Sequence, residues 1–80
     1  MLTEYIAAVL RRAHYKLLDD GAYFGEAPDL PGAWASADTL EACREELREV
    51  VEGWLIVGLT HGDVIPPVEG LTLEVTEAAS

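Results

Sequence analysis

Basic residues are scarce in this chain, which has 5 lysines and arginines against 15 aspartates and glutamates and a formal net charge of -10. A surface of that sign repels phosphate backbones, so we expect no direct binding of nucleic acid. The same field would attract a basic protein and speed its docking. The charge also fits a simpler role, in which it keeps a small protein soluble.

Cysteine and long apolar runs are also nearly absent. Cys43 is the one cysteine of the sequence, which excludes a disulfide scaffold or a thiolate metal cluster within one chain. No base is indicated near Cys43, and we interpret it as a small buried hydrophobic residue of a helix. No apolar run approaches the roughly 20 residues that span a bilayer. The start of the chain is unlike a signal peptide, because Glu4 interrupts it and Arg11 and Arg12 follow its apolar stretch. We therefore expect a cytoplasmic protein without a membrane span.

The chain has 80 residues, half of them hydrophobic, which predicts one folded domain over residues 1–80. A domain of this size buries only about 60% of the surface that its unfolded chain exposes. Its core should therefore be thin, and association with another subunit would stabilise it.

Hydrophobic periodicity predicts six elements in the order α-β-β-β-α-β. They are a helix over residues 3–13, strands over 14–19, 22–27 and 33–36, a helix over 40–59 and a strand over 71–76. Asp20-Gly21 indicates a hairpin turn between the first two strands. Asp38 or Thr39 should cap the long helix, with Glu41 completing a capping box if Asp38 is the cap, and Gly62 should end the helix.

The predicted fold class is therefore α+β, a three-stranded antiparallel meander plus a fourth strand, with the long helix packed on one face. The opposite face of the sheet has only the first helix, or a neighbouring subunit, to cover it. The apolar stripe of the long helix broadens after Val50. We expect that end of the helix to be buried more completely or to meet a second subunit.

Residues 15–66 carry several short motifs at characteristic distances. They are Asp19-Asp20-Gly21 followed by Tyr23-Phe24, then Pro28-Asp29-Leu30-Pro31-Gly32, then Asp38-Thr39-Leu40-Glu41-Ala42 and the helix containing Leu47, and last Gly62 and Ile65-Pro66. In these motifs the chain resembles the HicB-like antitoxin family of the UPF0150 type. The proline-rich segment between the hairpin and the helix cap is the most specific part of the match.

The resemblance implies a partial ribonuclease-H-like fold and a non-enzymatic function without a cofactor. Members of the family neutralise HicA, a small basic toxin that cleaves messenger RNA, by covering its active surface, and they commonly form homodimers or homotetramers. Many also carry a C-terminal DNA-binding domain, which we do not find here. We therefore expect a stand-alone N-terminal domain, with a core over residues 14–76 and an extra helix over residues 1–13.

The predicted partner-binding residues lie on the hairpin and the turns after it. They are Asp19, Asp20, Tyr23, Glu26, Asp29 and Trp34. Tryptophan often anchors interfaces, and Trp34, on a short strand, suits that role better than Trp54, on the apolar stripe of the helix.

Two other functions stay open at this point. One is a solitary homo-oligomeric binding or scaffold module without a toxin. The other is a metal-dependent nuclease, since carboxylates are the ligands of hard metals, although turn chemistry already explains aspartates at these positions. His14 and His61 lie on different predicted elements, and we expect each to be exposed near a helix end rather than to be a zinc ligand or general base.

Overall fold

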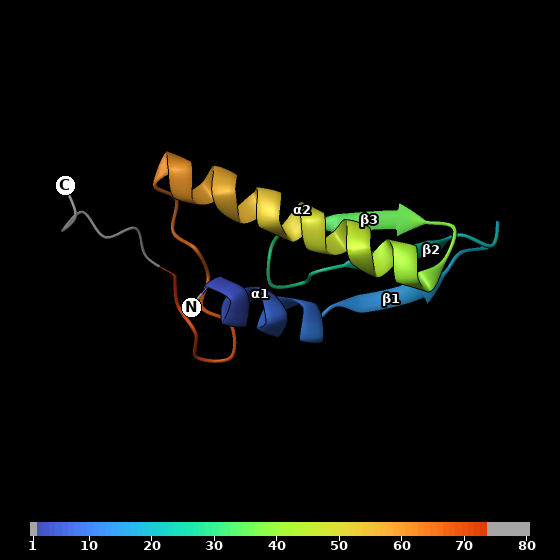
Figure 1. Cartoon of the computed structure of the whole chain (residues 1–80), viewed down its shortest axis with the longest axis horizontal. Helices are drawn as coiled ribbons and strands as arrows, with labels where there is room; N and C mark the ends of the chain where they lie inside the picture. The colour runs from blue at the N-terminus through green and yellow to red at the C-terminus, as the bar shows by residue number, and fades with distance from the viewer. Residues whose placement is uncertain (1, 74–80) are drawn as a thin grey trace.

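The structure is a computed structural model that describes residues 2–73. Its elements are α1 (Leu2–Arg11), β1 (His14–Leu17), β2 (Tyr23–Glu26), β3 (Trp34–Ala37) and α2 (Leu40–His61). The three strands form one antiparallel sheet in the order β1-β2-β3. Helix α2 runs along one face of the sheet, and α1 lies beside α2 beyond the start of β1 (Figure 1). The α+β class and the three-stranded meander are confirmed. Within residues 2–73, no helix combines the length and the apolar character that crossing a membrane requires.

The β1–β2 hairpin forms where the Asp-Gly signal predicts it. The N–H of Leu18 donates to the carbonyl of Ala22 at 2.7 Å, and the N–H of Gly21 donates to the carbonyl of Leu18 at 3.0 Å. Gly21 has a φ of 88°, a left-handed conformation that glycine adopts without steric cost. In the resulting register Lys16 pairs with Phe24.

Small side chains let α2 approach the sheet closely. Gly25 and Ala35 are buried at the centre of the sheet, and Cys43 of α2 is buried against them. A Cβ atom on Gly25 would lie 2.7 Å from the ring of Tyr15 and 3.2 Å from the Sγ of Cys43. The position therefore needs glycine for this packing. The prediction that Cys43 is buried is confirmed.

Both ends of α2 have the expected chemistry. The Oγ1 of Thr39 accepts a hydrogen bond from the N–H of Ala42 at 3.0 Å, so Thr39 is the N-cap. The capping box that would start at Asp38 is not used. Gly62 ends the helix with a φ of 73°, and its N–H bonds to the carbonyls of the last turn. The helix extends two residues beyond the predicted end, to His61.

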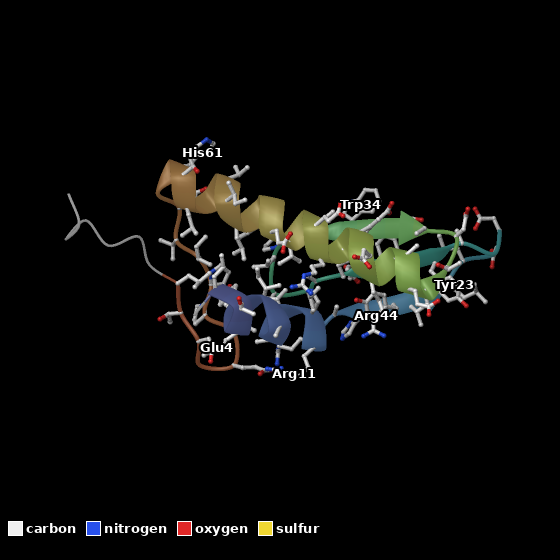
Figure 2. All side chains as sticks on the ribbon, viewed as in Figure 1. Glu4, Arg11, Tyr23, Trp34, Arg44 and His61 are labelled. Carbon is white, nitrogen blue, oxygen red and sulfur yellow. The ribbon has the colours of Figure 1, made fainter. Side chains whose placement is uncertain are left out.

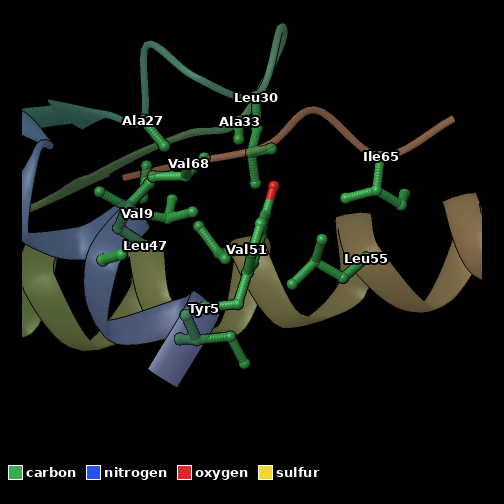
Figure 3. Close-up of a cluster of buried hydrophobic side chains, with 13 residues drawn as sticks. Tyr5, Val9, Ala27, Leu30, Ala33, Leu47, Val51, Leu55, Ile65 and Val68 are labelled. Carbon is green, nitrogen blue, oxygen red and sulfur yellow. The ribbon is translucent and has the colours of Figure 1, made fainter. Parts of the chain in front are cut away.

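The main core lies between the two helices and the segments that follow β2 and α2 (Figure 3). Its largest members with almost no exposed surface are Tyr5, Leu30, Leu47, Leu55, Val9, Val51 and Val68. Leu30 comes from the proline-rich turn, so this turn contributes to the core as well as reversing the chain. The hydroxyl of Tyr5 donates to the carbonyl of Pro66, which ties α1 to the segment after α2.

The predicted fourth strand is not confirmed. Residues 71–73 belong to no strand of the sheet, and residues 74–76 of the prediction lie outside the described part of the chain. Val68 and Leu71 instead bond to each other in both directions across a two-residue turn. Its central residues, Glu69 and Gly70, both have positive φ, at 50° and 79°, as in a tight hairpin turn.

For two surfaces, the cover that we expected from within the chain is not found in the described residues, and cover by another subunit stays a prediction. Helix α1 packs against α2 and does not cover the opposite face of the sheet, where Trp34 remains 56% exposed. The end of α2 is not buried more completely either, since Ile56 is 63% exposed and Val57 is 55% exposed. The sheet face opposite α2 lacks a cover within residues 2–73 because α1 packs against α2 instead.

Candidate partner-binding surface

The sheet face opposite α2 carries two aromatic side chains and several polar ones. Strand alternation and register bring together His14, Lys16, Phe24, Glu26, Trp34 and Ser36, which we call the open face. The rings of Phe24 and Trp34 stack, with centroids 5.8 Å apart and planes at 25°. The Nζ of Lys16 lies 5.4 Å from the centroid of the Phe24 ring, a cation–π distance. A stacked pair of this kind, half-buried at Phe24 and exposed at Trp34, is a typical anchor of protein interfaces.

Two of the predicted site residues meet on the open face. Glu26 on β2 is the direct cross-strand partner of Trp34 on β3. Both side chains are exposed, which places a carboxylate beside an indole ring. Tyr23 lies on β2 as well, but its position in the alternation puts it on the α2 side, where it is half-buried. Tyr23 is therefore separated by the sheet from Glu26 and Trp34.

The predicted aspartates lie at opposite ends of β2. Asp19 and Asp20 are exposed in the hairpin turn before β2, and the Oδ1 of Asp20 accepts a hydrogen bond from the N–H of Ala22 at 3.0 Å. Asp29 lies in the turn after β2, where the Nε of Arg12 donates to its Oδ2 at 2.7 Å. The structure thus does not bring the six predicted residues into one cluster. Asp20 and Asp29 both have structural roles inside the chain.

The cations of the chain are largely engaged in ion pairs. Arg11 pairs with Glu69 at 2.6 Å, and Arg12 pairs with Asp29. Hydrogen bonding to Arg11 lowers the pKa of the Glu69 carboxyl, and the same bond raises the pKa of Arg11. These pairs link the end of α1 and the following residue, Arg12, to the turns that contain Glu69 and Asp29.

The two long sides of α2 differ in charge, a difference that we did not predict from the sequence. On the side above β3, Glu46 and Glu49 line a groove together with Val50, Trp34, Ala35 and Ser36. On the other side, Arg44 and Arg48 line a groove with Arg11 and Tyr15, accompanied by Glu41 and Glu45. Figure 2 shows Trp34 and Arg44 on opposite sides of α2.

The groups with reactive side chains are dispersed in the described structure. Among residues 2–73, no three histidine, cysteine, aspartate or glutamate side chains lie close enough to share a metal ion. His14 begins β1 and His61 ends α2, so they do not meet. Burial raises the pKa of the Cys43 thiol, which keeps it in the protonated form that is a poor nucleophile.

The fold and the surface together define a small α+β domain with an acidic exterior and an uncovered aromatic sheet face. Residues 4–66 match the family described as UPF0150-like, and the chain belongs to that family. It is similar to the UPF0150 protein ssl0259 of Synechocystis sp., with 38% identity over 50 residues that cover 62% of this chain and 68% of that protein. It is also similar to the crystal structure of TTHA0281 from Thermus thermophilus, with a TM-score of 0.89, 38% identity and 95% of each chain covered.

Proposed function

We propose that this protein is a non-enzymatic antitoxin-like protein, which acts in the cytoplasm by binding and neutralising a small basic toxin of the HicA type. The observation that carries the proposal is the open face, where the exposed Trp34 stacks on Phe24 beside the carboxylate of Glu26. The proposal includes that this chain has the partial ribonuclease-H-like fold of family members with this role.

The electrostatics support a basic partner. The formal charge of -10 would attract a cationic protein over long range and raise its association rate. At contact, an arginine of the partner could lie on the Trp34 ring and pair with the Glu26 carboxylate, a combination of cation–π attraction and ion pairing. A toxin held in this way would be sterically prevented from reaching its RNA.

The first experiment is an affinity purification of the tagged chain from its native lysate at low salt, with mass spectrometry of the bound proteins. The captured basic protein is then purified and its cleavage of messenger RNA is measured with and without the chain. Stoichiometric inhibition of cleavage, relieved by high salt, supports the proposal. A captured protein without RNA-cleaving activity, or cleavage that the chain does not inhibit, contradicts it.

A second candidate function rests on a different observation. The described chain leaves apolar side chains exposed along the last part of α2 and next to it, with Ile56 63% exposed, Val57 55% and Val64 90%. Such exposure is typical of subunit interfaces. A solitary homo-oligomeric binding or scaffold module would use this surface, and sedimentation of the purified chain as a discrete multimer without a basic partner would favour it.

A further inference from the structure

Strand β3 has an edge that is available for pairing. It bonds to β2 on one side, and within residues 2–73 no strand pairs with its other side. The N–H of Ala27 donates to the carbonyl of Ala33 at 2.9 Å, which fixes the hydrogen-bonding phase between β2 and β3. Since bonded and non-bonded pairs alternate in an antiparallel ladder, the backbone groups of Trp34 and Ser36 point away from β2. They offer two N–H donors and two carbonyl acceptors to an added strand.

The surface next to this edge is acidic and partly apolar. Glu46, Glu49 and Val50 of α2 line the groove above the edge. The same side of α2 continues with a largely apolar groove lined by Val50, Gly53, Trp54, Val57, Gly58 and Asp63. The residues that line the two grooves include three carboxylates and no lysine or arginine.

The opposite edge of the sheet has a different environment. Strand β1 lies below the side of α2 that carries Arg44 and Arg48, and Arg11 of α1 lines the same groove. At the β1 edge a cationic segment would therefore meet three arginines besides Glu41 and Glu45, whereas Glu46 and Glu49 are the only charged residues that line the groove at the β3 edge. Charge thus distinguishes two edges that backbone geometry alone would leave equivalent.

We propose that the β3 edge and the adjoining acidic groove bind an extended basic segment of a protein partner as an added strand of the sheet. Side chains of such a strand alternate between the two faces. Those on the α2 side would reach Glu46 and Glu49, and those on the other side would contact Trp34. Backbone bonds would supply affinity, and the alternating cations would supply specificity. The proposal rests on the proposed function for the identity of the partner, and it adds how that partner is held.

A second copy of this chain is the competing occupant of the edge. Each copy carries a formal charge of -10, so an approaching copy would bring more negative charge to Glu46 and Glu49. Repulsion between like charges opposes that arrangement, and charge complementarity therefore selects the basic strand.

The test uses the full-length chain and a synthetic peptide of about eight residues that alternates arginine and threonine. Binding is measured by isothermal titration calorimetry at low and high salt. Two control peptides accompany it, one with glutamate in place of arginine and one N-methylated on alternate residues, which cannot donate along one edge. We expect binding of the arginine peptide alone, with an affinity that falls as salt rises.

Matched variants separate the groove from general charge. Glu46→Gln with Glu49→Gln should weaken binding about three- to tenfold, as expected from two exposed ion pairs. Glu41→Gln with Glu45→Gln makes the same charge change on the other side of α2 and should have much less effect. Ser36→Pro removes an outward N–H at a sheet edge, where proline is tolerated, and should weaken binding most.

The results decide the inference in either direction. The added strand is overturned if the arginine peptide does not bind, or if the N-methylated peptide binds equally well. It is also overturned if both glutamine double variants lose the same amount of peptide affinity, or if the chain self-associates and Ser36→Pro abolishes that association. If Ser36→Pro does not fold, the glutamine pairs and the N-methylated peptide still give the answer. If the variant with Glu46→Gln and Glu49→Gln neutralises a toxin as well as the natural chain does, the proposed function is retained and the added strand is rejected. Binding of the peptide without any toxin inhibition would retain the added strand and reject the proposed function.

Discussion

Replacing Trp34 with alanine should weaken association much more than it weakens folding. Trp34 is 56% exposed, and its ring stacks on the ring of Phe24. Loss of one stacked aromatic contact costs about 1 kcal/mol of unfolding free energy. A tryptophan that anchors an interface contributes at least about 2 kcal/mol to binding. That value corresponds to a dissociation constant about 30-fold higher.

Trp54 provides the matched control. It is half-buried, packs against the core, and its Nε1–H donates to the carbonyl of Pro31 at 2.9 Å. Trp54→Ala therefore removes both packing and a hydrogen bond, and we expect a loss of about 3 kcal/mol in unfolding free energy. The affinity of the molecules that remain folded should change less than in Trp34→Ala.

The two quantities are measured separately. Urea unfolding followed by circular dichroism gives the free energy of unfolding, and titration calorimetry with the purified basic partner gives the dissociation constant. In the absence of a partner, sedimentation equilibrium gives the self-association constant instead. If Trp34→Ala lowers folding stability and association by equal amounts, Trp34 is a packing residue and the anchor role is wrong.

Three further predictions concern the fold. Gly25→Ala should lower the unfolding free energy in urea by about 1–3 kcal/mol, because its Cβ would overlap the Tyr15 ring at 2.7 Å, and an unchanged midpoint would contradict this packing. Native Cys43 should resist alkylation at neutral pH and react fully in urea, since it is buried with a raised pKa; rapid native labelling would disagree. The pKa of Glu69 is lower in the folded chain than its ordinary value of about 4.5. Its ion pair with Arg11 therefore stabilises the folded chain at pH values above 4.5, and this stabilisation is lost as the pH falls through the folded pKa. Arg11→Gln should therefore be slightly less stable than the natural chain at neutral pH and equal to it once the pH is low enough to protonate Glu69 in the folded chain, and an equal difference under both conditions would contradict the pairing.

Local signals predicted the parts of the fold that depend on a few neighbouring residues. The Asp20-Gly21 turn forms because glycine adopts a positive φ, and Thr39 caps α2 because its hydroxyl reaches an N–H three residues later. The alternation of faces in the hairpin follows from strand geometry once the turn fixes the register. Each of these features can be read from fewer than about five residues of sequence.

In the segment after α2, the local sequence pattern did not predict the pairing partner. Leu71 and Leu73 alternate with polar residues, as in a half-buried strand, but the alternation does not specify a pairing partner. In the structure Leu71 pairs with Val68 across the Glu69-Gly70 turn. A two-residue turn ending in glycine is a usable sequence signal. The positive φ of Glu69 is not favoured by its own side chain, and the ion pair of Glu69 with Arg11 links the turn to α1.

The acidic groove required tertiary information that no local pattern contains. Glu46 and Glu49 are one turn apart on α2, and so are Arg44 and Arg48, which places each pair on its own side of the helix. The spacing thus contains a signal for two sides of different charge on α2, which we did not use in the sequence analysis. It does not indicate which side lies above which edge of the sheet, because that depends on the direction in which α2 crosses the strands. The observed crossing places the carboxylates above the free edge of β3 and the arginines above β1. The two pairs can be reversed without changing the net charge of the chain, by Arg44→Glu, Arg48→Glu, Glu46→Arg and Glu49→Arg. The β3 edge of this variant should bind an acidic strand instead of a basic one.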